Sequence, residues 1–188
     1  MPSHLPADIR SRLIPIRLLV LDVDGVLTDG RLYIAGEGEL VKRFSVRDGL
    51  GIRLLEEAGI AVAIITGRES TALAARCREL HLREGLVVQG SRDKGRDLDA
   101  IQAQLGVDDS QTAAMGDDLP DLPLLGRAGL AVCPSDAAPE VVAACDLVCG
   151  AAGGNGAVRE VAELILKGQQ RWVDVTGRWT QRDDGVAD

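Results

Sequence analysis

The sequence predicts an α/β fold built on a doubly wound parallel sheet, and three features of its pattern support this prediction. The runs at 17–22, 60–66 and 86–89 are almost continuously apolar, as strands buried on both faces are. Segments with helical spacing lie between these runs, and this alternation favours parallel strands joined by helical crossovers. The helices expected before Gly59 and Gly106 would end at a residue that readily adopts positive φ.

The first half of the chain yields elements that can be placed from local signals. Residues 1–15 contain three prolines and are expected to form a flexible arm ahead of a single domain over 16–170. Two β-prone runs flank a Gly-Glu-Gly-Glu turn and predict a protruding hairpin over about 31–46. The expected elements are a strand at 17–22, hairpin strands at 32–35 and 40–46, a helix from Asp48 or Gly49 to before Gly59, a strand at 60–66, a helix at 69–81 and a strand at 86–89.

The second half continues the alternation and ends in a segment of different character. The expected elements are a helix at 93–105, a strand at 112–118, a short helix within 119–129, a strand at 130–133, a helix at 136–144, a strand at 146–149 and a helix at 156–167. Residues 171–188 form a polar tail for which disorder is the default expectation. Trp172 and Trp179 lie in this tail, and in a chain with 2% aromatic residues they indicate that part of it packs.

Composition excludes several classes of protein. A net charge of −8 argues against general binding to nucleic acid or anionic membranes. No apolar run approaches the roughly 20 residues of a membrane span, and the N-terminus lacks the apolar core of a signal peptide, so a cytoplasmic protein is expected. The four cysteines form no CxxC motif and only His4 and His81 could join them, which favours buried free thiols over a zinc site.

Asp22 and Asp24 stand at the end of the first strand, in the string DVDGVLTDG. Ligands of open α/β sheets bind at the carboxyl ends of the strands. Two carboxylates one residue apart face opposite sides of a regular strand, so both reach one site only where the chain bends, which Gly25 favours. Mg²⁺, which takes oxygen ligands, would stabilise such a pair. A solvated acidic turn is the competing interpretation.

Three further polar groups follow later predicted strands. Thr66 and Gly67 could hold a phosphoryl oxygen through a hydroxyl and a backbone N–H, although Thr66 could instead cap the next helix. Lys94 lies near a helix N-terminus, where the helix dipole disfavours a cation unless it reaches an anion; alone, it would be interpreted as a surface lysine. The segment 112–118 is predicted as a strand that runs into an acidic turn, and the string Gly-Asp-Asp-Leu-Pro-Asp places Asp117, Asp118 and Asp121 in that turn, where a metal-binding role is favoured.

Taken in order, these motifs resemble the four motifs of the haloacid dehalogenase-like phosphatases. An aspartate pair, a threonine, a lysine and GDDxxD each follow a strand, in the order found in that superfamily. Most members carry an inserted cap domain over the site. Here the 44 positions from Asp22 to Thr66 hold only a hairpin, a helix and a strand, so no cap is expected. An open site excludes water poorly, which favours closure by another subunit.

The strings FSVRDGLGIRLL, AIITGRES, GDDLPDLPLL and AGGNGAVREVAELIL, together with the missing cap, resemble the family of 3-deoxy-D-manno-octulosonate 8-phosphate phosphatases over about residues 15–170. That resemblance implies a homotetramer whose neighbouring subunits complete each site, and a role in lipopolysaccharide synthesis in the cytoplasm. The implied substrate is a small sugar acid phosphate, with neither nucleic acid nor membrane as a partner.

The resemblance also implies a role for each motif residue. Asp22 would be the nucleophile that forms an aspartyl-phosphate, and Asp24 the general acid and base. Mg²⁺ would be held by Asp22, the backbone carbonyl of Asp24 and Asp117, with Asp118 and Asp121 orienting this group. Thr66, Gly67 and Lys94 would hold the phosphoryl group. The substrate pocket would include Asp24, Ser45, Val46, Arg47, Asp48, Gly49, Arg53, Gly67, Arg68, Arg76 and Lys94, the arginines being candidates for pairing with the sugar carboxylate.

Three other functions compete with this one. A phosphatase for a nonulosonic acid 9-phosphate would share the catalytic residues and differ in the pocket. A non-catalytic assembly module would have no need for intact Asp22, Asp24, Lys94 and Asp117. A phospho-acceptor signalling domain carries its phosphorylated aspartate after a later strand. In the tail, Gly177 lies between the tryptophans, and we expect Trp172 or Trp179 to pack at a subunit interface.

Overall fold

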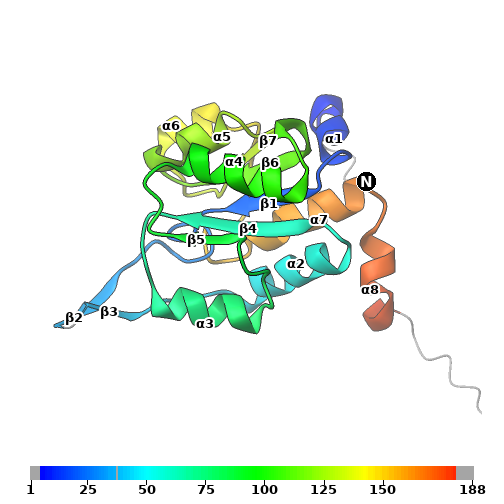
Figure 1. The fold of residues 1–188 in the computed structure, drawn as a ribbon. Helices are drawn as coiled ribbons and strands as arrows, with labels where there is room; N and C mark the ends of the chain where they lie inside the picture. The colour runs from blue at the N-terminus through cyan, green and yellow to red at the C-terminus, as the bar shows by residue number, and fades with distance from the viewer. Residues whose placement is uncertain (1–4, 37, 181–188) are drawn as a thin grey trace, which may run out of the picture.

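A six-stranded parallel sheet forms the centre of the computed structural model, which describes residues 5–36 and 38–180 (Figure 1). The strand order is β5-β4-β1-β6-β7-β8, as a doubly wound sheet requires. The strands are β1 Leu18–Leu21, β4 Ala61–Thr66, β5 Val87–Gln89, β6 Thr112–Met115, β7 Leu130–Cys133 and β8 Leu147–Val148. The predicted fold class is therefore confirmed, and in the described ranges no separate cap domain interrupts it.

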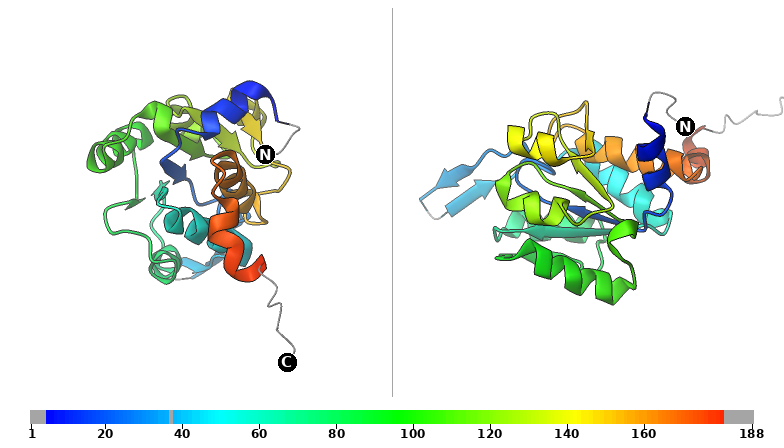
Figure 2. Two further views of the ribbon diagram at one scale, coloured as in Figure 1. Left: turned by 90° about the vertical axis from the view of Figure 1, so that its right-hand side faces the viewer. Right: turned by 90° about the horizontal axis from the view of Figure 1, so that it is seen from above.

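Helices cover both faces of this sheet. The helices are α1 Ala7–Leu13, α2 Val46–Glu57, α3 Thr71–Glu79, α4 Lys94–Leu105, α5 Leu122–Leu125, α6 Pro139–Ala144, α7 Ala157–Gly168 and α8 Trp172–Thr180, with short 3-10 turns η1 Asp109–Gln111 and η2 Leu119–Asp121. In Figure 1, α4, α5 and α6 lie over one face, and α2, α3 and α7 over the other; Figure 2 shows the same layers from two further sides.

Alternating residues of β1 divide the core between these layers. Leu19 and Leu21 join the apolar cluster beneath α2, α3 and α7, whereas Leu18 and Val20 join the cluster beneath α4, α5 and α6. All four side chains are fully buried. Because both faces of β1 are covered, the strand position is fixed, and the residues that follow it are held at one edge of the sheet.

The hairpin projects beyond the sheet edge as a separate two-stranded ribbon (Figures 1 and 2). Its antiparallel strands are β2 Tyr33–Ala35 and β3 Gly38–Val41. The predicted second strand at 40–46 was too long, because the chain leaves the ribbon at Lys42 and then enters α2. Ser45 caps that helix by accepting hydrogen bonds from the backbone N–H groups of Arg47 and Asp48.

The N-terminal segment corrects one prediction. Residues 7–13, expected within a flexible arm, form α1, whose Ile9 and Leu13 are buried in the cluster that also holds α7. Gln169 strengthens this attachment by donating hydrogen bonds to the carbonyl oxygens of Leu13 (3.0 Å) and Ile16 (2.8 Å). Pro6 lies at the N-cap of α1, so a proline taken as a sign of loose structure begins a helix.

The C-terminal segment also contains more structure than expected. Residues 172–180 form α8, and Trp172 packs partly buried against the core cluster of its own chain. Its ring lies 5.4 Å from the Arg159 guanidinium and 4.8 Å from the Lys167 ammonium. Trp179 remains 56% exposed. Its packing at a subunit interface stays a prediction, and residues 181–188 of the predicted tail lie outside the described residues.

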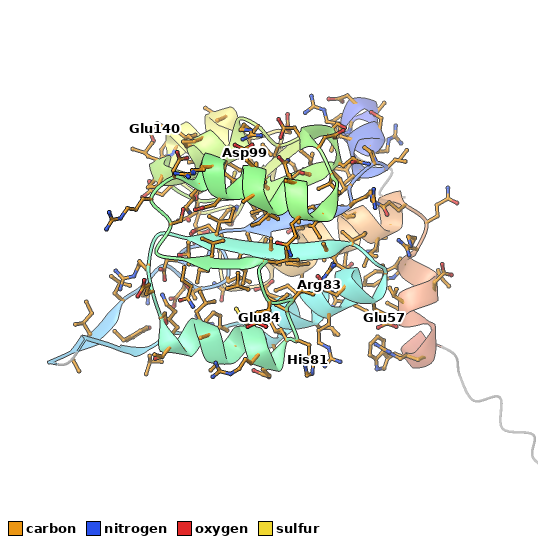
Figure 3. All side chains as sticks on the ribbon, viewed as in Figure 1. Glu57, His81, Arg83, Glu84, Asp99 and Glu140 are labelled. Carbon is orange, nitrogen blue, oxygen red and sulfur yellow. The ribbon has the colours of Figure 1, made fainter. Side chains whose placement is uncertain are left out.

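Charged side chains cover the outer helices of the described part of the chain. Figure 3 shows Glu57, Asp99 and Glu140 among the side chains on the outer helices, with His81 in the turn after α3. The four cysteines are free thiols; Cys77, Cys133 and Cys149 are buried as predicted, whereas Cys145 is half-buried. None of the described helices is both long and apolar enough to span a bilayer.

Candidate active site

Three neighbouring strands, β4, β1 and β6, bring the predicted motifs to one edge of the sheet. Thr66 is the last residue of β4, Asp22 follows β1, and Asp117 lies two residues beyond β6. The backbone N–H of Asp22 donates to the carbonyl of Met115 (3.0 Å), which ties the exits of β1 and β6 together. From β1 the chain adds β4 and β5 on one side and β6, β7 and β8 on the other, so the topological switch point of the sheet lies between β1 and β6. Open α/β sheets bind their ligands at this point.

Lys94 bridges two carboxylates at this edge. Its Nζ lies 2.6 Å from Asp22 Oδ1 and 2.5 Å from Asp121 Oδ1. The Lys94 side chain is 9% exposed, so the interpretation as a surface lysine is wrong. Two anions offset the unfavourable position of this cation at the start of α4.

Asp121 also shapes the acidic loop after β6. Its Oδ2 accepts hydrogen bonds from the backbone N–H groups of Asp117 (2.9 Å) and Asp118 (3.3 Å). Asp118 in turn accepts from the N–H of Leu119 (2.8 Å) and caps η2. Asp121 therefore fixes the backbone from which the Asp117 side chain projects.

Burial and mutual repulsion perturb the carboxylates. Burial, together with the charge of Asp121, raises the pKa of Asp22 to about 6 in spite of the opposing effect of Lys94. Burial and the charges of Asp22, Asp121 and Asp118 raise the pKa of Asp117 to about 7. Burial disfavours the charged form of Lys94, but Asp22 and Asp121 raise its pKa overall. The cluster thus holds more negative charge than its own cations offset.

The residues present fit a divalent cation. Asp22, Asp117 and Asp121 each offer an oxygen, and these atoms lie within 4.8 Å of one another; no other such group occurs among the residues that the structure describes. Gly25 has φ of +95°, and a Cβ on it would lie 2.0 Å from Asp117 Oδ2, so only glycine leaves room for this carboxylate. Carboxylate oxygens arranged around a small space match the preference of Mg²⁺.

Asp24 has a different environment from Asp22. Lys42 forms an ion pair and hydrogen bond with its Oδ1, and Arg68 Nε lies 3.5 Å from its Oδ2. Asp24 Oδ2 is buried and has no hydrogen-bond partner. Sequence reasoning missed Lys42; the available signal was a lysine inside the otherwise β-prone string LVKRF.

Thr66, Gly67 and Arg68 line the same open pocket, whose volume is about 600 Å³. Thr66 is 2% exposed, and its Oγ1 accepts a hydrogen bond from the Arg68 N–H (3.4 Å). The alternative that Thr66 caps the next helix is wrong, because Ser70 is the N-cap of α3. The remaining pocket residues are Asp22, Asp24, Gly30, Ser91, Arg92, Asp93, Lys94, Asp117, Asp118, Pro120, Asp121 and Pro123.

Seven predicted substrate-binding residues do not reach this pocket within the chain: Ser45, Val46, Arg47, Asp48, Gly49, Arg53 and Arg76. Asp48 is 1% exposed, and its carboxylate accepts from the N–H groups of Gly156 (3.1 Å) and Arg159 (2.8 Å). Within this chain the Asp48 carboxylate therefore contacts the start of α7, and its predicted contact with substrate stays a prediction. Arg76 donates to the Ser45 carbonyl (3.2 Å) beside Gly49.

The other members of this group lie on α2. Val46 is 82% exposed, and Arg53 is exposed as well. Arg47 lines a separate surface hollow with Asn155 and Arg159. Within one chain none of them lines the pocket that holds Asp22 and Lys94, so their predicted contact with substrate stays a prediction for a neighbouring subunit.

Comparison with known proteins identifies the family. A profile for haloacid dehalogenase-like hydrolases matches residues 86–161. The 3-deoxy-D-manno-octulosonate 8-phosphate phosphatase KdsC of Escherichia coli strain B / BL21-DE3 is 41% identical over 172 residues, which cover 92% of this chain and 90% of that protein.

Solved structures agree with this similarity. The 3-deoxy-D-manno-octulosonate 8-phosphate phosphatase of Yersinia pestis superposes with a TM-score of 0.86 at 42% identity, covering 89% of each chain. The enzyme of that name from Moraxella catarrhalis, solved with magnesium, phosphate and KDO, superposes with a TM-score of 0.87 at 39% identity, covering 92% of this chain and 98% of that one. The chain therefore belongs to the 3-deoxy-D-manno-octulosonate 8-phosphate phosphatase family of haloacid dehalogenase-like hydrolases.

Proposed function

We propose that this chain is a Mg²⁺-dependent phosphatase that hydrolyses 3-deoxy-D-manno-octulosonate 8-phosphate to the free sugar acid and phosphate. The observation that carries the proposal is the meeting of Asp22, Asp117 and Lys94 at the wall of one open pocket, with Asp24 beside them. The names of the relatives, and the magnesium, phosphate and KDO bound by the Moraxella catarrhalis enzyme, support the substrate and the metal.

Asp22 is the proposed nucleophile. One of its carboxylate oxygens attacks phosphorus in line, and the bond from phosphorus to the sugar oxygen breaks, which gives an aspartyl-phosphate. Asp24 donates a proton to the departing sugar oxygen. In the second half-reaction Asp24 takes a proton from water, whose oxygen attacks phosphorus and releases Asp22 and phosphate.

The metal ligands would be Asp22, Asp117 and the backbone carbonyl of Asp24. When bound there, Mg²⁺ supplies positive charge that lets an anionic nucleophile approach an anionic ester. Asp121 orients this group, because its carboxylate accepts hydrogen bonds from the backbone N–H of Asp117 and from the ammonium of Lys94.

The phosphoryl oxygens and the sugar acid would be held by different parts of the pocket. Thr66, Gly67 and Lys94 offer a hydroxyl, a backbone N–H and an ammonium to the phosphoryl group. Arg68 lies in the same pocket and can pair with the sugar carboxylate. We propose that a homotetramer completes the open side, with Ser45, Val46, Arg47, Gly49, Arg53 and Arg76 contributed between subunits, and that the enzyme serves lipopolysaccharide synthesis in the cytoplasm.

A phosphate-release assay over a panel of sugar phosphates tests this proposal. The purified chain is assayed with Mg²⁺ against 3-deoxy-D-manno-octulosonate 8-phosphate, a nonulosonic acid 9-phosphate and neutral sugar phosphates. We expect kcat/KM to be highest for the first of these by at least about tenfold, which corresponds to about 1.4 kcal/mol of transition-state binding. A higher value for the 9-phosphate would assign the chain to that related activity, and no turnover of any phosphate would favour an assembly role.

A further inference from the structure

Lys42 is a buried cation at the base of the hairpin. Its side chain is 2% exposed, although the hairpin to which it is attached projects from the domain (Figure 1). Removing an ammonium from water is costly unless it meets an anion, and Lys42 meets the Asp24 carboxylate. The next residue, Arg43, instead points outward and bonds Asp29 (3.4 Å) and Asn155 (3.1 Å).

The two oxygens of Asp24 are not equivalent. Oδ1 holds the contact with Lys42, whereas Oδ2 has no hydrogen-bond partner and lies 3.5 Å from Arg68 Nε. Asp24 lines the phosphoryl pocket, but Lys42 is not among the residues that line it. Lys42 is therefore placed to act on the reaction through its contact with Asp24.

The geometry points to Lys42 as the positioning residue that holds Oδ1 of Asp24 and so fixes the carboxylate that transfers a proton to the departing sugar oxygen. This inference rests on the proposed phosphatase function. An anchored Oδ1 restricts rotation of the carboxylate, and proton transfer needs one oxygen within hydrogen-bond reach of the leaving group. Because Lys42 belongs to the hairpin, the position of the hairpin sets the position of the general acid.

Lys42 differs in this respect from Lys94. Lys94 lines the pocket and contacts Asp22 and Asp121, so an incoming phosphoryl group can compete for its ammonium. Lys42 is shielded from that competition and keeps its contact with Asp24. The two lysines thus serve the two aspartates of the DxD motif separately, one at the phosphoryl group and one at the leaving group.

The dependence on leaving group separates positioning of a general acid from a purely structural effect. A sugar alkoxide must be protonated as it leaves, whereas p-nitrophenolate leaves without a proton. The parameter kcat/KM reports steps up to formation of the aspartyl-phosphate, so the later hydrolysis does not obscure the comparison. We therefore measure kcat/KM of Lys42→Met with the sugar phosphate and with p-nitrophenyl phosphate.

We expect Lys42→Met to lower kcat/KM by about 100-fold for the sugar phosphate and by less than about fivefold for p-nitrophenyl phosphate, since general acid catalysis contributes about 10²–10⁴-fold. Lys42→Arg, which keeps the charge, should recover part of the loss on the sugar phosphate. The matched control is Arg43→Met, which removes a neighbouring cation of the same hairpin and should leave both substrates within about twofold of the wild type.

Equal losses for the two substrates, or no loss for either, would overturn the inference. Circular dichroism and subunit mass establish that each variant is folded; if Lys42→Met is not, Lys42→Gln is measured against the same two criteria. Asp22→Asn is assayed in parallel. If that variant keeps wild-type turnover, the phosphatase mechanism itself fails; if it is inactive while Lys42→Met shows no leaving-group dependence, only the role of Lys42 fails.

Discussion

Asp22 and Asp48 are both buried aspartates, but the structure surrounds them with opposite kinds of partner. Asp48 is 1% exposed and its two oxygens accept backbone N–H groups at the start of α7. Asp22 is 6% exposed and has Lys94 as its ion-pair partner, which it shares with Asp121. Burial raises the pKa of both groups, so burial alone does not distinguish them.

The difference between the two sites shows how an aspartate that stabilises the fold can be distinguished from one that is a candidate for catalysis. The donors around Asp48 are fixed backbone groups that match its two oxygens, and the site lies away from the phosphoryl pocket. Asp22 stands at the pocket wall beside Asp117 and Asp121, where carboxylates repel one another. Such repulsion is tolerated where a cation binds and a nucleophile is needed.

The largest expected effect comes from Asp22→Asn. The amide cannot attack phosphorus, so phosphate release should fall by at least about 10³-fold. Urea unfolding should show no loss of stability, because the substitution removes a charge from a repulsive cluster. Turnover near the wild-type rate would rule out Asp22 as the nucleophile.

The same substitution at Asp48 should have the opposite result. In Asp48→Asn an amide NH₂ replaces one acceptor and faces a backbone N–H at the start of α7, so the free energy of unfolding should fall by about 1–3 kcal/mol. We expect phosphate release per folded molecule to stay within about tenfold of the wild type. A collapse of kcat with unchanged stability would return Asp48 to the substrate-binding residues predicted from sequence.

A smaller effect should appear in the pH dependence of stability without metal. The pKa of Asp117 is raised from 3.8 to about 7, so between these values the folded chain holds a proton that the unfolded chain has lost. The contribution of this group to stability therefore falls as pH rises through that window. In EDTA, Asp117→Asn should be more stable than the wild type by about 1 kcal/mol at pH 8, with a smaller difference at pH 5, after allowance for partial solvent screening.

Added Mg²⁺ should reverse this order. Binding to the folded state stabilises the wild type, whereas Asp117→Asn loses one of the proposed ligands. Unfolding curves with and without Mg²⁺ at pH 8 provide the measurement. An identical pH dependence in the two proteins would show that Asp117 does not titrate in the cluster.

Local sequence signals predicted the sheet and the meeting of the motif residues at one of its edges. The bounds predicted from continuous apolar runs differ from those of β1 and β4 by at most one residue at either end. Gly59 and Gly106 follow their helices with positive φ, as expected. The carboxyl ends of parallel strands lie at the same edge of a sheet, and β4, β1 and β6 are neighbours in this one. This arrangement brings together Asp22, Thr66 and Asp117.

The errors arose where contacts depend on distant parts of the chain. Pro6 indicated a loose arm, yet α1 forms because Ile9 and Leu13 find an apolar surface that also includes α7. Lys42 could not be assigned, since its contact with Asp24 depends on how the hairpin leaves the domain. The motif around Asp48 also gave no sign that its carboxylate would accept hydrogen bonds from residues 108 and 111 positions away.

A crystal structure with Mg²⁺ and a phosphate mimic such as vanadate tests the central claim most directly. We expect an ion about 2.0–2.1 Å from carboxylate oxygens of Asp22 and Asp117, with the second Asp22 oxygen facing the mimic in line. An Asp22 side chain turned away from the mimic, with no ion between it and Asp117, would contradict the account.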